Sequence, residues 1–183
     1  MKGEGMSDDH QQASAWARTM LSTRDWAVLD TETTGLSRED EIVQIAILAA
    51  DERVLLDPLI RPTRPIPPDA TAIHGITDRD VASAPIFPEI YDRLRAMLAD
   101  RRVVIYNAEF DLRLLNQTLL KYGMPIWNFP PDRVECAMLR YSAWKGEIWG
   151  DGSYKWQKLE GGDHTALGDC RATLALIRRM AEA

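Results

Sequence analysis

Two carboxylates, Asp30 and Glu32, stand two residues apart immediately after the apolar run 26–29. If this run is a strand, its period-2 alternation directs both carboxylates to one face and Thr31 to the other. Two carboxylates on one face form half of a site for a divalent cation, although an isolated Asp-x-Glu is more often a solvated strand end. The Thr-Thr-Gly at 33–35 then predicts a tight turn where the backbone can approach a phosphate group closely.

Two further carboxylates lie near the starts of expected helices. Asp111 follows a short apolar strand expected at 103–106, with Asn107 placed to cap the helix, and Asp169 lies near the start of the last helix. An aspartate in a first helical turn is often only a partner of the helix dipole, worth ~0.3–1 kcal/mol. The carboxyl end of a strand is also where open α/β sheets bind ligands, so both aspartates are candidates for the same site.

A histidine precedes the last of these aspartates by five residues. On one helix, His164 and Asp169 would diverge, so we expect His164 on the connecting loop and Thr165 as the cap of the helix. A histidine with a pKa of ~6.5 can accept a proton from water at neutral pH, a contribution of roughly 10²–10⁴ in rate.

Four converging carboxylates repel one another. At ~4 Å and an effective dielectric constant of about 20, each pair costs about 4 kcal/mol, which protons or cations must offset. Two divalent cations about 3.5–4 Å apart would do so, and oxygen ligands suit Mg²⁺, with Mn²⁺ as a substitute, rather than Zn²⁺. One ion would lower the pKa of the attacking water and the other would stabilise the leaving 3′ oxygen. The expected chemistry is hydrolytic phosphoryl transfer.

Hydrophobic periodicity predicts the elements that position these residues. Three strands in succession form a β-meander, and strand and helix then alternate, which predicts an α/β fold with a mixed sheet. Ser7, Asp8 and Asp9 are candidate caps of the first helix. The proline-rich stretch 57–68 is too interrupted to be helical, and 142–162 has no clear period. Strands are expected over 26–30, 41–50, 54–60 and 103–106, and helices over 7–24, 86–99, 109–122, 132–141 and 166–180.

Composition limits the class of protein. A chain of 183 residues with 45% hydrophobic content can build one buried core. The net charge of −6 is unusual for a nucleic-acid enzyme, but bound cations reverse the local sign of a carboxylate cluster. Cys136 and Cys170 have no metal-type spacing, no apolar run approaches the ~20 residues of a membrane span, and the N-terminus is unlike a signal peptide. We therefore expect a cytoplasmic protein that does not enter a membrane.

Three motifs in order carry a family resemblance: Asp30-Thr-Glu32-Thr-Thr-Gly, Asn107-x-x-Phe110-Asp111 and His164-x-x-x-x-Asp169. Together the motifs resemble those of the DEDDh exonucleases, the DnaQ-like group that includes the proofreading subunit of bacterial replicases. The resemblance implies a ribonuclease H-like fold, with a central mixed five-stranded sheet flanked by helices, over 25–183 after an N-terminal helical extension, 1–24. It further implies a 3′–5′ exonuclease that releases nucleoside 5′-monophosphates. The four carboxylates would hold two metal ions, and His164 would be the base.

The resemblance also implies a pocket for the terminal nucleotide. The segment 72–77 looks like the family's A-x-H-G-I stretch, which brings His74 and Ile76 to this pocket. Thr33, Thr34, Asn107 and Phe110 match further positions expected to contact substrate. One departure stands out. A Tyr-Lys-Leu-like start at 154–159 is followed almost at once by His164, so a helix is missing or reduced, and Gly161 and Gly162 predict a mobile loop.

Several alternatives stay open at this stage. Substrates would be single-stranded 3′ ends, of DNA rather than RNA, with a DNA polymerase as a candidate partner. An RNA-specific exoribonuclease and a catalytically idle nucleic-acid-binding or polymerase-adaptor domain are the rivals, and an internally cutting ribonuclease H is disfavoured by His164 and the terminal-pocket segment. Four tryptophans between 127 and 156 either pack in the core or stack on bases, with Trp144 and Trp149 the better candidates for exposure. Oligomeric state stays open.

Overall fold

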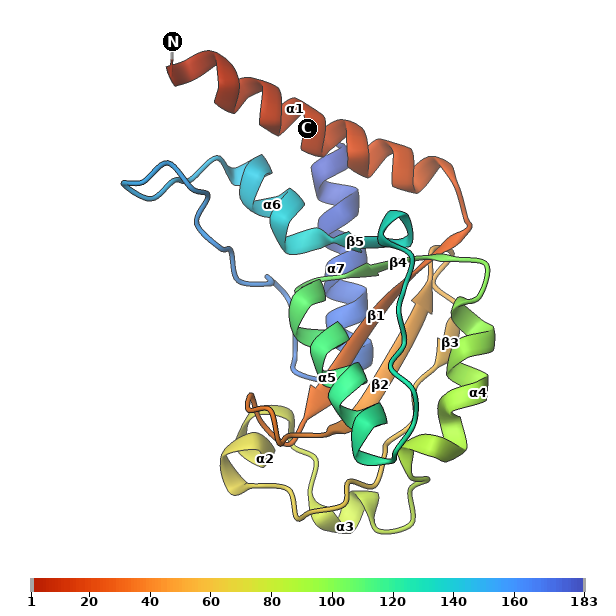
Figure 1. Ribbon diagram of the computed structural model, residues 1–183. Helices are drawn as coiled ribbons and strands as arrows, with labels where there is room; N and C mark the ends of the chain where they lie inside the picture. The colour runs from red at the N-terminus through yellow and green to blue at the C-terminus, as the bar shows by residue number, and fades with distance from the viewer. Residues whose placement is uncertain (1, 183) are drawn as a thin grey trace.

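A computed structural model describes the backbone of residues 2–182 and the side chains of residues 8–182. Its centre is a mixed five-stranded sheet in the order β3-β2-β1-β4-β5 (Figure 1), which confirms the predicted fold class. The strands are β1 (Trp26–Thr33), β2 (Ile42–Ala49), β3 (Val54–Leu56), β4 (Arg102–Ile105) and β5 (Val134–Cys136). The helices are α1 (Lys2–Ser22), α2 (Pro68–His74), α3 (Asp78–Val81), α4 (Phe87–Leu98), α5 (Ala108–Lys121), α6 (Ala137–Lys145) and α7 (Ala166–Ala181).

The predicted meander is present at one side of the sheet. β1 and β2 pair antiparallel, with Asp30 opposite Ala46, and β2 pairs antiparallel with β3. β4 then lies parallel to β1, and β5 parallel to β4. Parallel strands have their carboxyl ends at one edge of the sheet. Asp30, in the carboxyl half of β1, and Asn107, just after β4, therefore lie toward the same edge.

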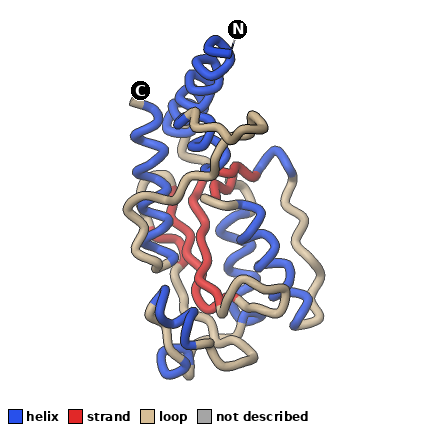
Figure 2. Tube along the Cα trace, turned by 90° about the vertical axis from the view of Figure 1, so that its left-hand side faces the viewer, coloured by secondary structure: helices blue, strands red, loops and turns tan. Residues whose placement is uncertain are grey.

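Helices cover both faces of the sheet, as the side view in Figure 2 shows. Because side chains alternate along β1, Ala27 and Leu29 pack on one face with α4 and α5, whereas Trp26 and Val28 pack on the other with α6 and α7. The two faces therefore have separate apolar cores. This alternation also decides which face of the sheet Asp30, Thr31 and Glu32 meet.

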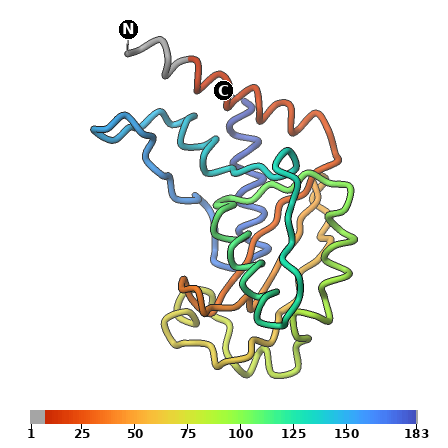
Figure 3. The backbone as a smooth tube through the Cα atoms, in the orientation of Figure 1, coloured from red at the N-terminus to blue at the C-terminus, as the bar shows by residue number. Residues whose placement is uncertain are grey.

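Helix α1 packs across α6 and α7, beyond the sheet (Figure 3). Its residues Ala13, Ala17 and Met20 are buried in the same core as Val28, and the Trp26 indole nitrogen donates to the Met20 carbonyl at 2.7 Å. The helix begins at Lys2, so the predicted caps at 7–9 are wrong and lie inside the helix. The division into an extension at 1–24 and a domain at 25–183 stays a prediction.

Two predictions of local structure were wrong. The helix expected over 132–141 is a 3₁₀ turn at Pro131–Arg133, then β5, then α6. β5 is short and half-buried and pairs in parallel with β4, and three residues carry too little periodicity to be recognised from sequence. The strand expected to reach residue 60 ends at Leu56.

Below the sheet, two short helices, α2 and α3, follow the proline-rich stretch (Figure 1). Glu41, only 1% exposed, fixes this stretch because its carboxylate accepts from the Thr63 amide and hydroxyl and from Lys121. None of the helices within residues 2–182 combines the length and the apolar character that crossing a bilayer requires.

Candidate active site

Three carboxylates from two elements form a cluster at the end of β1. Asp30 and Glu32 leave the strand on the face covered by α7, as the alternation from Val28 requires. Asp169 comes from the first turn of α7, which packs on β1 and β2. Ligand oxygens of the three residues all lie within 4.8 Å of one another. We call Asp30, Glu32 and Asp169 the acidic cluster.

Asp111 adjoins this cluster from the other face of the strand. It is 4% exposed in the first turn of α5, and its carboxylate accepts from the Thr31 hydroxyl at 2.7 Å. Asp30 and Glu32 face α7. Thr31 lies between them on a pleated strand, so its side chain points to the opposite face, toward α5. The structure thus brings three of the four predicted ligands together, with the fourth held beside them by Thr31.

Burial and mutual repulsion favour protonation of these groups. Desolvation, with repulsion from Asp169 and Asp111, raises the pKa of Glu32 to about 8. Desolvation also raises the pKa of Asp111 to about 7, against the lowering effect of the Thr31 hydrogen bond. The pKa of Asp30 lies well above its usual value because of burial and repulsion from Asp111, Asp169 and Glu32.

The donor set fits hard divalent cations. None of the ion pairs between described side chains involves Asp30, Glu32, Asp111 or Asp169, so protein cations leave their repulsion uncompensated. The ligands are carboxylate oxygens alone, which Mg²⁺ and Mn²⁺ prefer.

The loop before α7 is organised around Asp169. One oxygen of this carboxylate accepts from the backbone amides of Asp163 and His164, at 3.0 and 3.2 Å. His164 is exposed and has a φ of 59°, a conformation that is uncommon outside glycine and is found at functional sites. A Cβ on Gly162 would lie 2.6 Å from the same Asp169 oxygen, so only glycine fits there.

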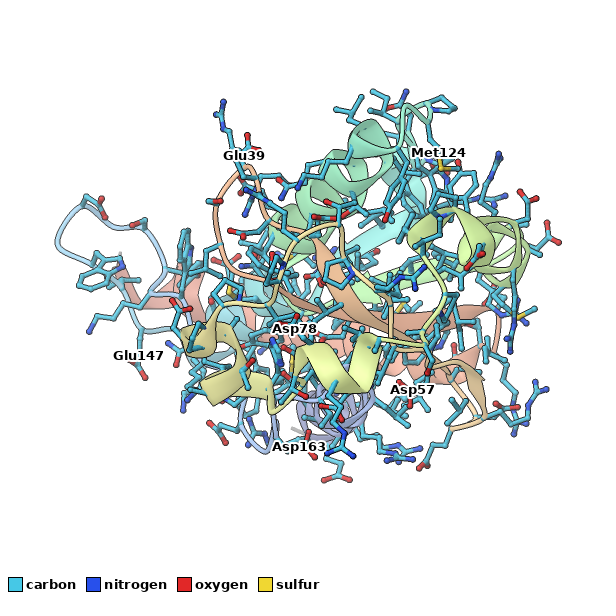
Figure 4. The ribbon with its side chains drawn as sticks, turned by 90° about the horizontal axis from the view of Figure 1, so that it is seen from below. Glu39, Asp57, Asp78, Met124, Glu147 and Asp163 are labelled. Atoms are coloured by element: carbon cyan, nitrogen blue, oxygen red, sulfur yellow. The ribbon has the colours of Figure 1, made fainter. Side chains whose placement is uncertain are left out.

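The predicted position of His164 is confirmed: it lies on the loop, and α7 begins at Ala166. Thr165 caps the helix, accepting from the Gly168 amide at 3.0 Å. The missing helix is also confirmed, since the chain between Lys145 and Ala166 contains none. Figure 4 shows Asp163 beside the start of α7 and Glu147 on the irregular arm that projects to one side. Whether the glycine loop is mobile stays a prediction.

The threonines after Glu32 are engaged in the turn they were expected to form. The Thr33 hydroxyl donates to the Gly35 carbonyl at 2.8 Å, and the Thr34 hydroxyl donates to Asp40 at 2.9 Å. A Cβ on Gly35 would lie 2.8 Å from the Asp40 carboxylate. The close packing of this turn explains the glycine.

His74 connects the segment 72–77 to strand β1 through hydrogen bonds. Its Nδ1 accepts from the Ile76 amide at 3.0 Å, and its Nε2 lies 3.2 Å from the Thr33 carbonyl. The side chain is 8% exposed, and burial lowers its pKa. Because Nδ1 accepts from a backbone amide, the ring proton lies on Nε2, which donates to the Thr33 carbonyl. Both ring nitrogens therefore contact the backbone, while Ile76 packs in a small core with Val43.

At the start of α5, one detail of the prediction was wrong. Asn107 occupies the cap position, but its side chain makes no capping hydrogen bond, and its carbonyl accepts from the Phe110 amide at 3.0 Å. The reason is the backbone of Asn107, whose φ of −116° and ψ of 79° depart from the extended conformation of a cap. The Phe110 ring is half-buried, with the Arg113 guanidinium 5.2 Å above it.

Of the four tryptophans between 127 and 156, two pack against other aromatic rings and two are exposed. Trp127 stacks on Phe129 with ring centroids 4.1 Å apart, and Trp144 stacks on Tyr141 at 5.9 Å, so both pack. The expected exposure of Trp144 was wrong, because α6 directs it between Tyr141 and His10 of α1. Trp149 is 58% exposed and Trp156 is 75% exposed.

Sequence reasoning missed three residues that organise the site. Thr31 holds Asp111, Arg113 donates to the Leu36 and Ser37 carbonyls at 3.3 Å, and Tyr106 donates to the Gln157 carbonyl at 2.6 Å. Only the position of Thr31 could be read from the sequence, because strand alternation places its side chain on the face opposite to Asp30 and Glu32. The partners of Arg113 and Tyr106 are distant in sequence.

Comparison with known proteins identifies the family. The family model RNase_T, described as an exonuclease, matches residues 27–177. An uncharacterized exonuclease, CP81, of Escherichia phage 186 is 39% identical over 94% of this chain and 93% of its own length. A DNA polymerase III subunit epsilon-like protein of Rhodobacter capsulatus is 37% identical over 91% of this chain, which spans only 25% of that protein.

Solved structures agree in fold. Exonuclease X in complex with 5′-overhanging duplex DNA has a TM-score of 0.55 at 28% identity, covering 86% of this chain and 91% of that one. Exonuclease I of E. coli with a dA16 oligonucleotide has a TM-score of 0.67 at 19% identity, covering 86% and 42%. The nuclease domain of 3′hExo, a DEDDh family member bound to rAMP, has a TM-score of 0.63 at 14% identity, covering 88% and 94%. The chain therefore belongs to the DEDDh, or DnaQ-like, exonuclease family, whose members are 3′–5′ exonucleases.

Proposed function

We propose that this protein removes nucleotides one at a time from the 3′ ends of single-stranded DNA, releasing nucleoside 5′-monophosphates. The observation that carries the proposal is the acidic cluster with Asp111 beside it, since four carboxylates at one strand end impose a repulsion that a binding module would gain nothing from. An idle adaptor domain on the same fold is disfavoured for this reason.

In this proposal Asp30, Glu32, Asp111 and Asp169 hold two Mg²⁺ ions, for which Mn²⁺ can substitute. When bound, such ions supply Lewis-acid activation of water and stabilisation of the leaving 3′ oxygen. Asp169 is prepared for this role because one of its oxygens is held by two backbone amides and the other is left for a ligand. His164, on the loop beside Asp169, accepts the proton of the attacking water.

The turn at 33–35, together with His74, Ile76, Asn107 and Phe110, forms the proposed pocket for the last nucleotide. Within it His74 acts by holding the segment against Thr33, since both of its ring nitrogens already contact the backbone. DNA is favoured over RNA as substrate because several relatives are named DNA polymerase III subunit epsilon, and Exonuclease I is solved with a DNA oligonucleotide. A DNA polymerase is the proposed partner on the same ground.

Digestion of 5′-labelled single-stranded DNA and RNA in Mg²⁺, Mn²⁺ or EDTA tests this function. We expect a ladder of products shortened from the 3′ end, free mononucleotides, faster loss of DNA than RNA, and no cleavage in EDTA. Faster cleavage of RNA would favour the exoribonuclease, and no cleavage with either metal would favour the idle domain.

Asp30→Asn should abolish cleavage because it removes a charged ligand from the acidic cluster. Asp92→Asn is the matched control: it makes the same change on an exposed position of α4 and should retain the wild-type rate. A near-native rate for Asp30→Asn would contradict the site assignment.

A further inference from the structure

A groove of about 400 Å³ opens beside the turn of α5 that carries Asp111. It lies between the start of α5, the start of α6 and the segment 155–159. Small-molecule sites have volumes of ~300–1,000 Å³, so the groove can hold a planar ring. We call it the Trp156 groove, and its principal walls are Asn107, Phe110, Arg113, Met138, Leu139 and Trp156.

The walls are apolar and uncovered. Trp156 is 75% exposed and Leu139 59% exposed, although both are large hydrophobic side chains. A contiguous exposed apolar surface of this kind marks an interaction site more often than an isolated hydrophobic residue does.

The indole is exposed on a backbone that is held in place. The carbonyl of Gln157 accepts from the Tyr106 hydroxyl at 2.6 Å, and the amide of Lys155 donates to the Glu147 carbonyl at 2.8 Å. Trp156 lies between these two tethers. Because the backbone on both sides of Trp156 is already ordered, less conformational entropy is lost when a flat ligand stacks on the indole, which favours binding.

The charges around the groove suit a phosphate-bearing ligand. Arg113 lines it with its guanidinium over the Phe110 ring, whereas the Lys155 ammonium lies over the Trp149 ring, outside the groove. One carboxylate, that of the exposed Glu109, also borders the groove. The groove therefore combines aromatic faces with one basic side chain, Arg113, that can meet a phosphate group, and this combination is found in single-strand binding sites.

We propose that the Trp156 groove binds the nucleobase on the 5′ side of the scissile nucleotide, stacked on the Trp156 indole. This inference rests on the proposed function. Its carrying observation is continuity: Phe110 belongs both to the groove and to the proposed terminal pocket, and Asp111 follows it directly. A strand whose last nucleotide reaches the acidic cluster would leave along this wall, so a protein segment seated here would block the substrate.

The test compares two substrates. A methyl ester of thymidine 5′-monophosphate fills only the terminal pocket because its leaving group carries no ring, whereas a short single-stranded oligonucleotide also fills the groove. Trp156→Ala should lower the ratio of kcat/KM for the oligonucleotide to kcat/KM for the ester about tenfold, the loss expected for one stacked base. Trp156→Phe should restore most of the ratio because it retains an aromatic face.

Trp149→Ala is the matched control, because Trp149 is also exposed on the arm but lies outside the groove, under the Lys155 ammonium at 5.4 Å. It should leave the ratio at its wild-type value. An unchanged ratio for Trp156→Ala, or an equal fall for Trp149→Ala, would overturn the proposal.

A separate readout distinguishes failure of this proposal from failure of the proposed function. If the wild-type protein cleaves neither substrate, the function fails, and the groove is tested by the fluorescence anisotropy of a labelled oligonucleotide in Ca²⁺. Weaker binding by Trp156→Ala than by Trp149→Ala then supports the groove, and equal binding overturns it. Thermal unfolding of each variant verifies the fold.

Discussion

Thr31 connects the residues on the two faces of strand β1. Its neighbours Asp30 and Glu32 face α7, and its own hydroxyl reaches Asp111 on α5. Removal of the hydroxyl leaves a buried carboxylate without this donor, and partners of metal ligands typically contribute ~10–100-fold to metal affinity or activity. We therefore propose that Thr31, which lies between two proposed ligands, positions the third, Asp111.

Thr31→Val keeps the size of the side chain and removes the hydrogen bond. We expect Mn²⁺ affinity, measured by isothermal titration calorimetry, to fall roughly 10–100-fold, and Thr31→Ser to restore it. Thr19→Val, on the exposed side of α1, is the control and should bind as the wild type does. Unchanged affinity in Thr31→Val would show that Asp111 needs no such support.

The raised pKa values predict how pH affects the metal-free protein. The pKa of Glu32 is about 8 in the folded chain against an ordinary value of 4.5, so protonated Glu32 favours folding. Its contribution to stability is complete below about pH 4.5 and is lost as pH rises through about 8. In EDTA, the unfolding temperature should therefore fall between about pH 5 and about pH 8.5, and Glu32→Gln should flatten the decline. A wild-type unfolding temperature that rises over this range would contradict the prediction.

The loop before α7 is the element that holds His164, the proposed base, beside Asp169, a proposed metal ligand. Asp163 accepts from the Thr165 amide and hydroxyl at 3.0 and 2.8 Å, and its own amide donates to Asp169. These bonds set the position of His164 between them. The loop thus lies where the family resemblance led us to expect a further short helix before His164.

Gly168→Ala tests this loop. A Cβ at Gly168 would lie 1.9 Å from the Asp163 carboxylate, so Asp163 must move and release Thr165. We expect kcat to fall roughly 10–100-fold, because small displacements of catalytic groups are costly, even though alanine favours a helix by about 1 kcal/mol. Gly150→Ala, where a Cβ meets nothing within 4 Å, should keep its activity. Equal kcat values for the two variants would mean that the loop tolerates displacement.

At the scale of the whole molecule, α1 contributes to the main core on the α7 face. Met20 is fully buried there and Leu21 next to it is 38% exposed. Met20→Ala should lower the free energy of unfolding in urea by about 2–5 kcal/mol, and Leu21→Ala by less than about 1 kcal/mol. Similar losses in the two variants would mean that α1 is only loosely docked.

Sequence alone predicted the features that depend on local pattern. Strand alternation predicted that Asp30 and Glu32 share one face. The order of the three motifs along the chain predicted that Asp111 and Asp169 belong to the same site. Features that depend on contacts between residues distant in sequence were missed. Strand β5 pairs with β4, and Trp144 is covered by α1. The backbone beside Trp156 is likewise held by a distant contact, the hydrogen bond from Tyr106 to Gln157, fifty-one positions apart.

The two cysteines differ in access, and this difference has a practical consequence. Cys136 is half-buried in the wall of the Trp156 groove, whereas the Cys170 thiol is enclosed and donates to the Val28 and Ala46 carbonyls. A thiol-reactive fluorophore should therefore label native protein at Cys136 alone and reach Cys170 only after unfolding. The unaltered chain thus carries its own attachment point for a dye that reports strand occupancy, and a second thiol that reports loss of the fold.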